Sequence, residues 1–273
     1  MRMIQLSDLH FGTERPEVMD ALVTVMHQLS PDLLLLSGDI TQRARRAQFR
    51  ACERLLARLP PAAIMAVPGN HDIPLFNLWQ RLVAPYAHFT RTFGDDLLPC
   101  HDSGQVLVVG VNTTCPRRHI DGTFTEKQIE TVAHRLKASH ARVKIVMGHH
   151  PVDAVLESDE RNIARGAERA VRTWTQAGMQ LYLAGHIHYP FCARLERRYP
   201  GLSPECWTFQ AGTAISFRVR DHKANSFNLI EWLPAQQALQ LERWDYTPAI
   251  EGFLCAEQIQ LPLRGGAGSS GSG

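Results

Sequence analysis

Several apolar runs of strand length divide the first two thirds of this chain, and each is followed closely by a short polar block. The runs are Met3–Leu6, Leu33–Leu36, Ala63–Val67, Val143–Met147 and Leu181–Ala184. None alternates with polar residues, which is typical of parallel strands that are covered on both faces. Such strands can deliver the side chains that follow them to one rim of a sheet. We therefore expect the chain to fold around a sheet of this kind.

The polar blocks supply side chains that bind metal ions. In chain order they are Asp8-Leu9-His10, Gly38-Asp39, Gly69-Asn70-His71-Asp72, Gly148-His149-His150-Pro151 and Gly185-His186-Ile187-His188. Asp, Asn and His gathered at one rim can hold two divalent cations side by side, and paired cations hydrolyse phosphate esters. A single block occurs by chance, whereas five in order after predicted strands are a specific signal.

Apolar residues spaced three and four positions apart predict helices between the strands. We expect helices at 16–29, 44–59, 125–139 and 164–176, and one more strand at 106–111. After residue 188 the pattern changes to strands at 207–210, 227–233 and 239–246, with a hairpin around 234–237. These later strands suggest a second sheet packed on the first. We predict an α/β fold, a four-layer α-β-β-α sandwich in which two mixed sheets pack together between helices.

Length and composition indicate one domain over residues 1–263. Residues 264–273 are mostly Gly and Ser and are expected to form a disordered tail or an added linker. The first candidate ligand, Asp8, leaves no room for a signal peptide before it, and no apolar stretch is long enough to span a bilayer. Six scattered cysteines without a CxxC pair favour reduced thiols. We therefore expect a cytoplasmic protein with no membrane partner.

The five blocks resemble the signature of the calcineurin-like metallophosphoesterase superfamily, which reads D-x-H, G-D, G-N-H-[DE], a later G-H and finally G-H-x-H. The residues in these motifs are most similar to those of the bacterial class III cyclic-nucleotide phosphodiesterases and glycerophosphodiesterases. The resemblance implies a hydrolase that cleaves phosphodiesters of these types through a metal-bound hydroxide. It also implies a small-molecule phosphate ester as the substrate.

Two metal ions need one shared anionic ligand, and Asp39 is the natural bridge because its carboxylate can place one oxygen on each metal. The resemblance assigns the remaining ligands. One ion takes Asp8, His10 and His188, and the other takes Asn70, His149 and His186. This mixed nitrogen and oxygen set suits divalent or trivalent ions of Mn, Fe, Co or Zn, and it does not choose among them.

His71 and Asp72 are the predicted catalytic residues. The resemblance implies that His71 faces the substrate phosphate, where it stabilises developing charge or protonates the leaving oxygen. Asp72 would hold the imidazole of His71 in the useful tautomer, although a carboxylate here also caps the following turn. His150, next to the ligand His149, either contacts substrate or packs.

Four further residues are candidate substrate contacts, and they are Asn112, Arg43, Arg117 and Arg118. Asn112 ends a predicted strand, and the two neighbouring arginines lie in a loop after it. Arg43 could meet a second phosphate or lie at a solvated helix start. Many members of the family read Thr-Asp-x-Gly where this chain has Thr41-Gln42-Arg43-Ala44, which weakens a transfer of cyclic AMP specificity.

Three other functions are compatible with the same motifs. A phosphomonoesterase of the superfamily would share every metal ligand, and only an activity assay can distinguish it from a phosphodiesterase. A nuclease would need a broad basic surface, and the formal charge of +2 argues against nucleic acid as a partner. A non-catalytic scaffold is disfavoured because every ligand position is filled. Aromatic residues near Trp79 line either a cap or a homodimer contact.

Overall fold

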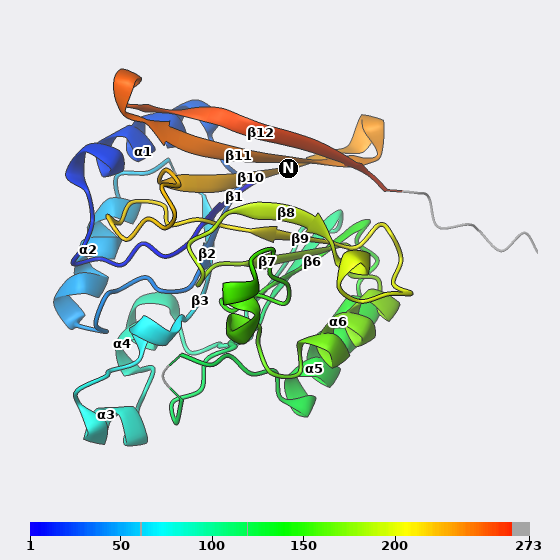
Figure 1. The fold of residues 1–273 in the computed structure, drawn as a ribbon, viewed down its shortest axis with the longest axis horizontal. Coiled ribbons are helices and arrows are strands. Elements are labelled where there is room, and N and C mark those ends of the chain that lie inside the picture. Colours follow the sequence, from blue (N-terminus) through cyan, green and yellow to red (C-terminus); the bar gives the residue numbers. More distant parts are fainter. Residues whose placement is uncertain (61, 119, 264–273) are drawn as a thin grey trace, which may run out of the picture.

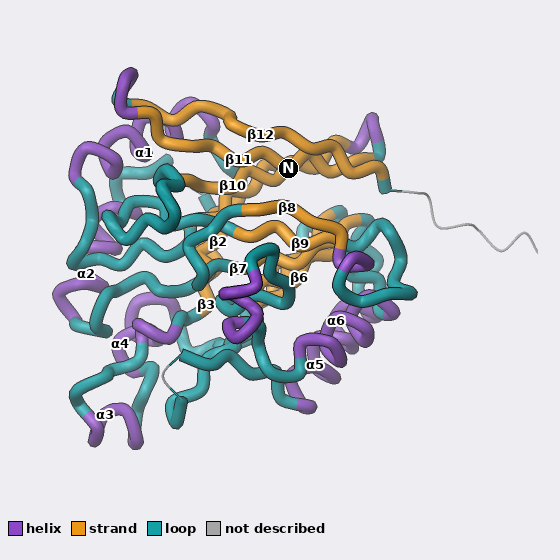
Figure 2. The backbone as a smooth tube through the Cα atoms, viewed as in Figure 1, coloured by secondary structure: helices purple, strands orange, loops and turns teal. Residues whose placement is uncertain are grey.

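The computed structural model describes residues 1–60, 62–118 and 120–263 (Figure 1). The predicted tail at 264–273 lies outside these described residues. Within them, two six-stranded sheets lie face to face between helices (Figure 2). This arrangement confirms the predicted four-layer sandwich of two mixed sheets.

The first sheet has the strand order β12-β11-β10-β1-β2-β3. Its strands are β1 (Arg2–Leu6), β2 (Leu33–Ser37), β3 (Ala63–Val67), β10 (Ser226–Leu233), β11 (Ala238–Thr247) and β12 (Gly252–Pro262). β1, β2 and β3 pair in parallel, as their continuous apolar runs predict, and β10 joins β1 antiparallel. The predicted hairpin turns at Pro234–Gln236, between β10 and β11.

The second sheet has the strand order β4-β5-β6-β7-β9-β8. Its strands are β4 (Cys100–Asp102), β5 (Val106–Gly110), β6 (Val143–Met147), β7 (Leu181–Ala184), β8 (Phe191–Arg194) and β9 (Trp207–Gln210). β5, β6, β7 and β9 are parallel, and the two edge strands are antiparallel.

The predicted division of strands between the sheets is wrong. We expected the strands after residue 188 to form the second sheet, yet β10, β11 and β12 extend the sheet that begins with β1. β9 instead pairs with β7 in the other sheet. Periodicity identifies a strand but not its partner, because pairing depends on contacts distant in sequence.

The helices are α1 (Pro16–Leu29), α2 (Arg46–Leu56), α3 (Leu78–Val83), α4 (Ala87–Phe93), α5 (Glu126–Ala138) and α6 (Ala167–Gln176). α1 and α2 contribute buried residues such as Leu22 and Phe49 to a core against the first sheet. α5 and α6 do the same against the second sheet, with Trp174 at its centre. A third core, which includes Leu35 and Ile145, fills the space between the sheets. Apolar contacts therefore dominate each interface between layers and provide the main stabilisation of the fold.

α1 has the predicted bounds, whereas α2 and α6 begin two to three residues later than predicted. α5 begins after Thr125, whose hydroxyl accepts from the amide of Gln128 as an N-cap. The segment at 74–93 forms two short helices, α3 and α4, and the described residues contain no helix that is long and apolar enough to cross a membrane.

Candidate metal centre

The loops after five strands carry the candidate ligands. Asp8 and His10 follow β1, Asp39 follows β2, and Asn70 follows β3 in the first sheet. The loops after β1 and β2 run side by side, because the amides of Asp8 and His10 donate to the carbonyls of Gly38 and Asp39. The remaining ligands come from the second sheet. The metal centre is thus shared by two adjoining sheet edges, whereas a single rim was predicted.

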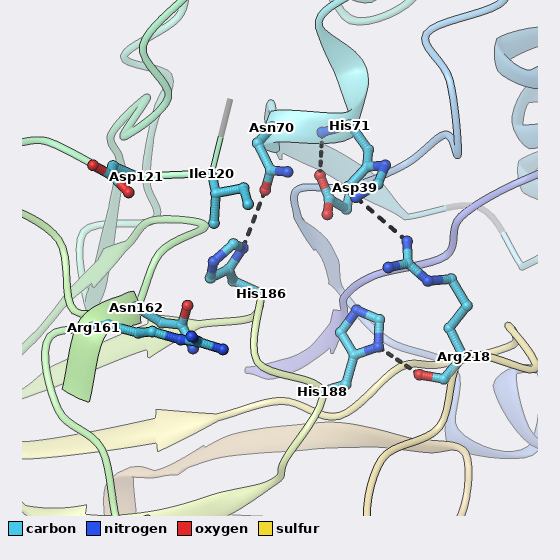
Figure 3. A pocket seen from close by; sticks show the side chains of 10 residues that line it. All are labelled: Asp39, Asn70, His71, Ile120, Asp121, Arg161, Asn162, His186, His188 and Arg218. Atoms are coloured by element: carbon cyan, nitrogen blue, oxygen red, sulfur yellow. Dashed lines mark hydrogen bonds between the residues drawn. The ribbon is translucent and has the colours of Figure 1, made fainter. Parts of the chain in front are cut away.

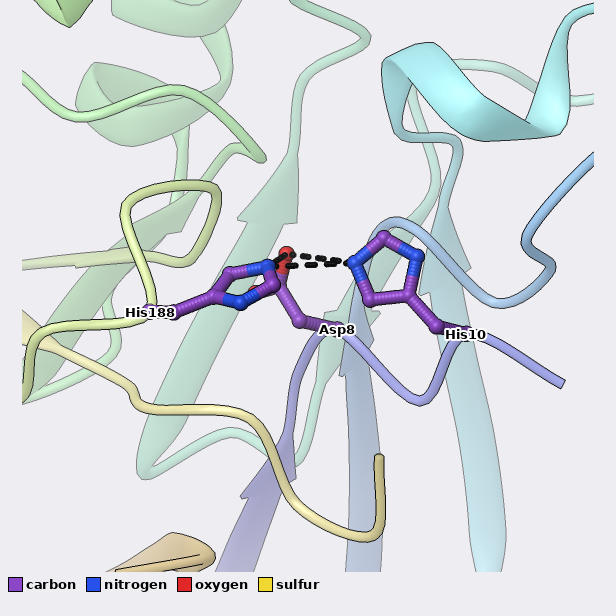
Figure 4. A group of neighbouring side chains, drawn as sticks. All are labelled: Asp8, His10 and His188. Carbon is purple, nitrogen blue, oxygen red and sulfur yellow. Dashed lines mark hydrogen bonds and ion pairs between the residues drawn. The ribbon is translucent and has the colours of Figure 1, made fainter. Parts of the chain in front are cut away.

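Asp8, His10 and His188 form the first half-site (Figure 4). The Nε2 atoms of His10 and His188 lie 3.1 Å apart, and Asp8 Oδ1 lies 3.2 Å from His188 Nε2. The other oxygen of Asp8 accepts from the Ser7 hydroxyl at 2.6 Å and from the His186 amide at 3.0 Å. These bonds fix the carboxylate with Oδ1 aimed into the half-site.

Asp39, His149 and His186 form the second half-site, and Asn70 lies between the two histidines. The Asn70 Oδ1 atom is 3.2 Å from His149 Nε2 and 3.1 Å from His186 Nδ1. Figure 3 shows Asn70, Asp39 and His186 around the same space. The two half-sites contain all seven predicted metal ligands.

Asp39 joins the half-sites through one oxygen. Its Oδ2 lies 3.6 Å from His10 Nε2 and 3.4 Å from His149 Nε2, so it faces both groups. Its Oδ1 accepts a hydrogen bond from the His71 amide at 2.7 Å. Oδ2 is thus the oxygen that faces both half-sites, while the predicted division of the two oxygens between two metals stays a prediction.

The ligand loops hold a strained backbone. Asp8, His10, Asp39, His186 and His188 all have positive φ values, between 46° and 74°. A side chain in this left-handed region costs on the order of 1–3 kcal/mol, and such strain is concentrated at functional sites. The left-handed backbone replaces the extended strand at these residues. It directs the side chains of His186 and His188 toward the same centre.

Glycines in the motifs leave room for the ligands. A Cβ at Gly69 would lie 2.2 Å from Asp39 Oδ1, and a Cβ at Gly185 would lie 2.5 Å from Asp8 Oδ2. Any larger residue at either position would displace a carboxylate of the centre. The motif glycines are therefore required by close approach to the ligands.

Backbone carbonyls fix the tautomers of two ligand histidines. His149 Nδ1 donates to the Ser37 carbonyl at 2.8 Å, and His188 Nδ1 donates to the Arg218 carbonyl at 2.5 Å. In each ring Nε2 is then the atom that faces the centre. A hydrogen bond on the outer nitrogen is the usual way in which proteins orient a metal-binding imidazole.

The charges of the centre are strongly coupled in the metal-free protein. Burial opposes ionisation of Asp39, but the charges of His149 and His71 outweigh it and lower its pKa well below the ordinary value. Burial likewise acts against the charged form of His149, yet Asp39 raises its pKa to about 9. Burial lowers the pKa of His10 to about 3. The centre thus holds anionic carboxylates and at least one neutral imidazole.

The donor set fits two metal ions. Asp8 Oδ1 is buried, and among the described residues its polar neighbours are the inward Nε2 atoms of His188 at 3.2 Å and His10 at 3.7 Å, the arrangement of a shared cation site. The inward atoms of His10 and His188 meet this oxygen, and those of His149 and His186 meet Asn70 Oδ1. Carboxylate, amide and imidazole ligands suit Mn, Fe, Co or Zn.

His71 lies beside the centre, but Asp72 does not orient it. His71 Nδ1 donates to the Gln42 carbonyl at 2.9 Å. Both oxygens of Asp72 accept instead from the backbone amides of Ile40, Thr41 and Gly69. Asp72 therefore ties the β2 and β3 loops together, and the Gln42 carbonyl sets the tautomer of His71.

His150 and Asn112 have structural contacts away from the cavity. His150 Nδ1 meets the Thr113 hydroxyl at 2.7 Å, and its Nε2 donates to the Ile120 carbonyl at 2.8 Å. The Asn112 Oδ1 atom accepts from the amide and hydroxyl of Thr114. The contacts of His150 support packing, which was one of its two predicted roles, and the substrate contact of Asn112 stays a prediction.

The three predicted arginines lie outside the cavity walls. Arg43 stacks on the Phe76 ring at 5.7 Å, and Arg118 contacts the Thr123 hydroxyl at 3.4 Å. Arg117 lines a separate hollow beside α3, together with Leu78. Cationic residues in surface loops are usually solvated, and sequence position alone could not show which of them turn inward.

The cavity over the centre has a volume of about 440 Å³. Its walls include residues that the sequence analysis did not single out, and these are Ile120, Asp121, Arg161, Asn162 and Arg218 (Figure 3). They come from irregular segments between strands, where no periodicity or motif marks them. Only their place in the fold identifies them.

A family model described as "Calcineurin-like phosphoesterase" matches residues 1–190 of this chain. The chain is similar to a probable cyclic nucleotide phosphodiesterase of Synechococcus sp., at 26% identity over 201 residues, which cover 70% of this chain and 74% of that protein. It is also similar to a probable glycerophosphodiester phosphodiesterase GpdQ of Arcobacter nitrofigilis, at 23% identity over 201 residues, which cover 69% of this chain and 72% of that protein.

Solved structures share the fold at low identity. A dimetal phosphatase from Danio rerio superposes with a TM-score of 0.67 at 14% identity, covering 97% of this chain and 99% of that one. The purple acid phosphatase PPD1 from yellow lupin (Lupinus luteus) seeds gives 0.70 at 12% identity, covering 95% of this chain and 53% of that one. The chain belongs to the calcineurin-like phosphoesterase family, whose members hydrolyse phosphoric ester bonds.

Proposed function

We propose that this protein is a phosphodiesterase that uses two metal ions, with substrates of the cyclic-nucleotide or glycerophosphodiester type. The observation that carries the proposal is the position of Asp39 Oδ2, which faces both half-sites. The names of the two relatives from Synechococcus sp. and Arcobacter nitrofigilis favour a diester over a monoester.

When bound, a pair of such cations lowers the pKa of water and withdraws charge from a phosphoryl group. Asp8 and Asp39 supply the negative charge that holds cations at this place, and Mn, Fe, Co and Zn remain equal candidates. The carbonyls that accept from Nδ1 of His149 and His188 direct the Nε2 atoms of these rings inward, and a metal bound there would displace the proton that His149 carries in the metal-free protein.

We assign His71 the proton transfer. Its Nδ1 is committed to the Gln42 carbonyl, so Nε2 is the ring atom that can exchange a proton with the substrate. Protonated at Nε2, His71 would stabilise negative charge on the phosphoryl group or protonate the leaving oxygen. Its amide, bonded to Asp39, holds the ring beside the centre.

Hydrolysis of bis(p-nitrophenyl) phosphate against p-nitrophenyl phosphate, with Mn²⁺-loaded protein, tests the proposal. We expect a clear preference for the diester. A preference for the monoester would instead assign the protein to the phosphomonoesterases, which is the alternative function. If the protein with both metals bound hydrolyses neither ester, the proposal that it accepts phosphodiesters without strict selectivity is contradicted.

Three further proposals concern partners and location. The near-neutral charge supports the absence of a nucleic-acid partner, which a salt titration of DNA binding would test. The exposed side chains of Trp79 and Leu82 on α3 support a homodimer, which light scattering would test. The cytoplasmic location stays a prediction.

A further inference from the structure

The backbone of the metal ligand His188 is held by residues outside the ligand motifs. His188 completes the first half-site with Asp8 and His10 (Figure 4), and its φ of 55° lies in the strained left-handed region. Such a conformation persists only where the surrounding contacts fix it. Resting on the proposed two-metal function, we infer that Arg220 is a positioning residue that fixes His188, with the buried Asp159 as its anchor.

The guanidinium of Arg220 joins three segments of the chain. Its Nη1 donates to the Ile187 carbonyl at 3.3 Å and to the carboxylate of Asp159. Its Nη2 donates to the Ser158 hydroxyl at 3.1 Å, and its Nε pairs with the neighbouring Asp221 at 3.3 Å. The loop between β9 and β10, which carries Arg220, is thereby tied to the ligand loop after β7 and to the short 3-10 helix that contains Ser158.

The bond to the Ile187 carbonyl acts on His188 rather than on His186. This carbonyl belongs to the peptide unit that precedes His188, so a bond to it restricts rotation about φ of His188. His186 is attached to the sheet instead, because Gly185 directly follows β7 and its amide donates to a carbonyl of the loop after β6 at 2.9 Å. Arg220 therefore acts on the first half-site and leaves the second in place.

The loop that carries Arg220 holds the first half-site in two further ways. The carbonyl of Arg218 accepts from Nδ1 of His188 (Figure 3). The hydroxyl of Thr213 donates to the Asp8 carbonyl at 2.6 Å. This loop thus contacts two of the three ligands of the half-site, yet it lies beyond the part of the chain that the family model matches. Its position depends on its own contacts, among which those of Arg220 reach furthest.

Asp159 anchors the guanidinium of Arg220. The residue is buried, with an exposed fraction of 1%. Its Oδ1 accepts from Arg220 and from the Asn162 side-chain amide at 3.1 Å, and its Oδ2 has no hydrogen-bond partner among the residues that the structure describes. A buried carboxylate that loses its cation is strongly unfavourable, so Arg220 cannot turn toward solvent without a cost. Neither Arg220 nor Asp159 is a sequence-predicted site residue.

A second ion pair on the same 3-10 helix offers a matched control. Glu160 pairs with Arg198, whose Nη1 lies 2.9 Å from the carboxylate. Arg198 also contacts the buried Asp153, which keeps another partner in Arg197 at 2.8 Å. Within the described parts of the chain, Arg198 makes no hydrogen bond or ion pair with the ligand loop at 185–188. Arg198→Gln therefore removes a charge from the same segment without releasing a ligand.

Calorimetric titration of the metal-free protein with Mn²⁺ tests the inference through binding rather than turnover. Wild type should bind two ions. Loss of a residue that orients a ligand typically lowers metal affinity by about 10–100-fold, so Arg220→Gln should weaken one ion by this factor and the other by less than about 3-fold. Arg198→Gln should change the affinity of either ion by less than about 3-fold.

A double variant identifies the ion that is weakened. His188→Ala removes the ligand on which Arg220 acts. If the two residues act on the same ion, adding Arg220→Gln to His188→Ala should change manganese affinity by less than about 3-fold further. An additional loss of about 10-fold or more would overturn the inference, because Arg220 would then support the protein independently of His188.

Arg220→Lys separates positioning from general stability in a variant that keeps a cation beside Asp159. A lysine offers one compact ammonium in place of the planar fork, so it cannot reproduce the bonds to Asp159, Ser158 and Ile187 together. Its Tm should stay near that of wild type, while one ion still binds about 5-fold or more weakly.

Wild-type affinity for both ions in Arg220→Gln and Arg220→Lys, or equal weakening of both ions, would overturn the inference. A single manganese ion bound to wild type would instead contradict the proposed two-metal function, so the two failures are distinguishable.

Discussion

Gly69→Ala is expected to damage the metal centre without removing a ligand. The Cβ of an alanine at this position would lie 2.1 Å from the backbone nitrogen of Asp39 and 2.2 Å from its Oδ1. Ordinary contacts begin near 3.4 Å, so Asp39 must move by about 1.3 Å. Backbone atoms cannot rotate away as a flexible side chain can, and the bridging carboxylate moves with them.

The effect of such a displacement on rate and stability can be estimated. Misplacement of a reacting group by about 1 Å can lower the rate by about 100-fold. Overpacking a filled site costs about 1–3 kcal/mol of folding free energy. For a domain of this size each kcal/mol lowers Tm by about 2–4 °C.

The assay measures kcat/KM for bis(p-nitrophenyl) phosphate, bound manganese and Tm of Gly69→Ala. The matched control is Gly252→Ala at the start of β12, where the nearest atoms to an added Cβ are 3.5 Å away. The control should keep wild-type activity. If Gly69→Ala retains activity within twofold of wild type and binds a full complement of metal, the reasoning from close approach is refuted.

Three other changes test the separate parts of the centre. Asp39→Ala should abolish both metal pairing and turnover, as metal analysis and kinetics will show; retained activity would overturn the bridging assignment. His71→Ala should keep both metals but lower kcat by about 10²–10⁴-fold, and loss of metal instead would make His71 a ligand. In the metal-free protein, burial would lower the pKa of His149, but Asp39 raises it from 6.5 to about 9. That proton stabilises the metal-free fold fully below pH 6.5, and this stabilisation is lost once the pH has risen through 9. Because a metal ion must displace the proton, metal affinity measured by calorimetry should rise between pH 6.5 and 9. A metal affinity that does not change with pH would contradict the assignment of His149 as a ligand.

The sequence predicted the parts of the fold that depend on local pattern. β3, β6 and β7 have the bounds that their apolar runs indicate, and α1 ends where its amphipathic spacing ends. The partition of strands between the sheets could not be predicted, because β10 joins β1 across more than two hundred residues. Pairing at that separation depends on the packed core, which a period of two does not specify.

In the candidate site, too, the residues in local motifs were predicted, whereas contacts between distant segments were not. The family resemblance, together with the bridging role argued for Asp39, named the seven candidate metal ligands, and the structure brings them together because each lies in the short loop after a strand. The role of Asp72 was predicted wrongly, because its carboxylate turns to the amides of the β2 loop and leaves His71 to the Gln42 carbonyl. Arg161 and Arg218 were not predicted, since they lie in segments without a periodic pattern or motif and only the fold brings them to the cavity.

The central claim is that two metal ions share Asp39 in one centre. Its most direct test is the number of manganese ions bound per chain after dialysis, combined with an electron paramagnetic resonance spectrum of the loaded protein. We predict two ions per chain and magnetic coupling between them, both lost in Asp39→Ala. One ion per chain, or two ions without coupling, would contradict the shared centre.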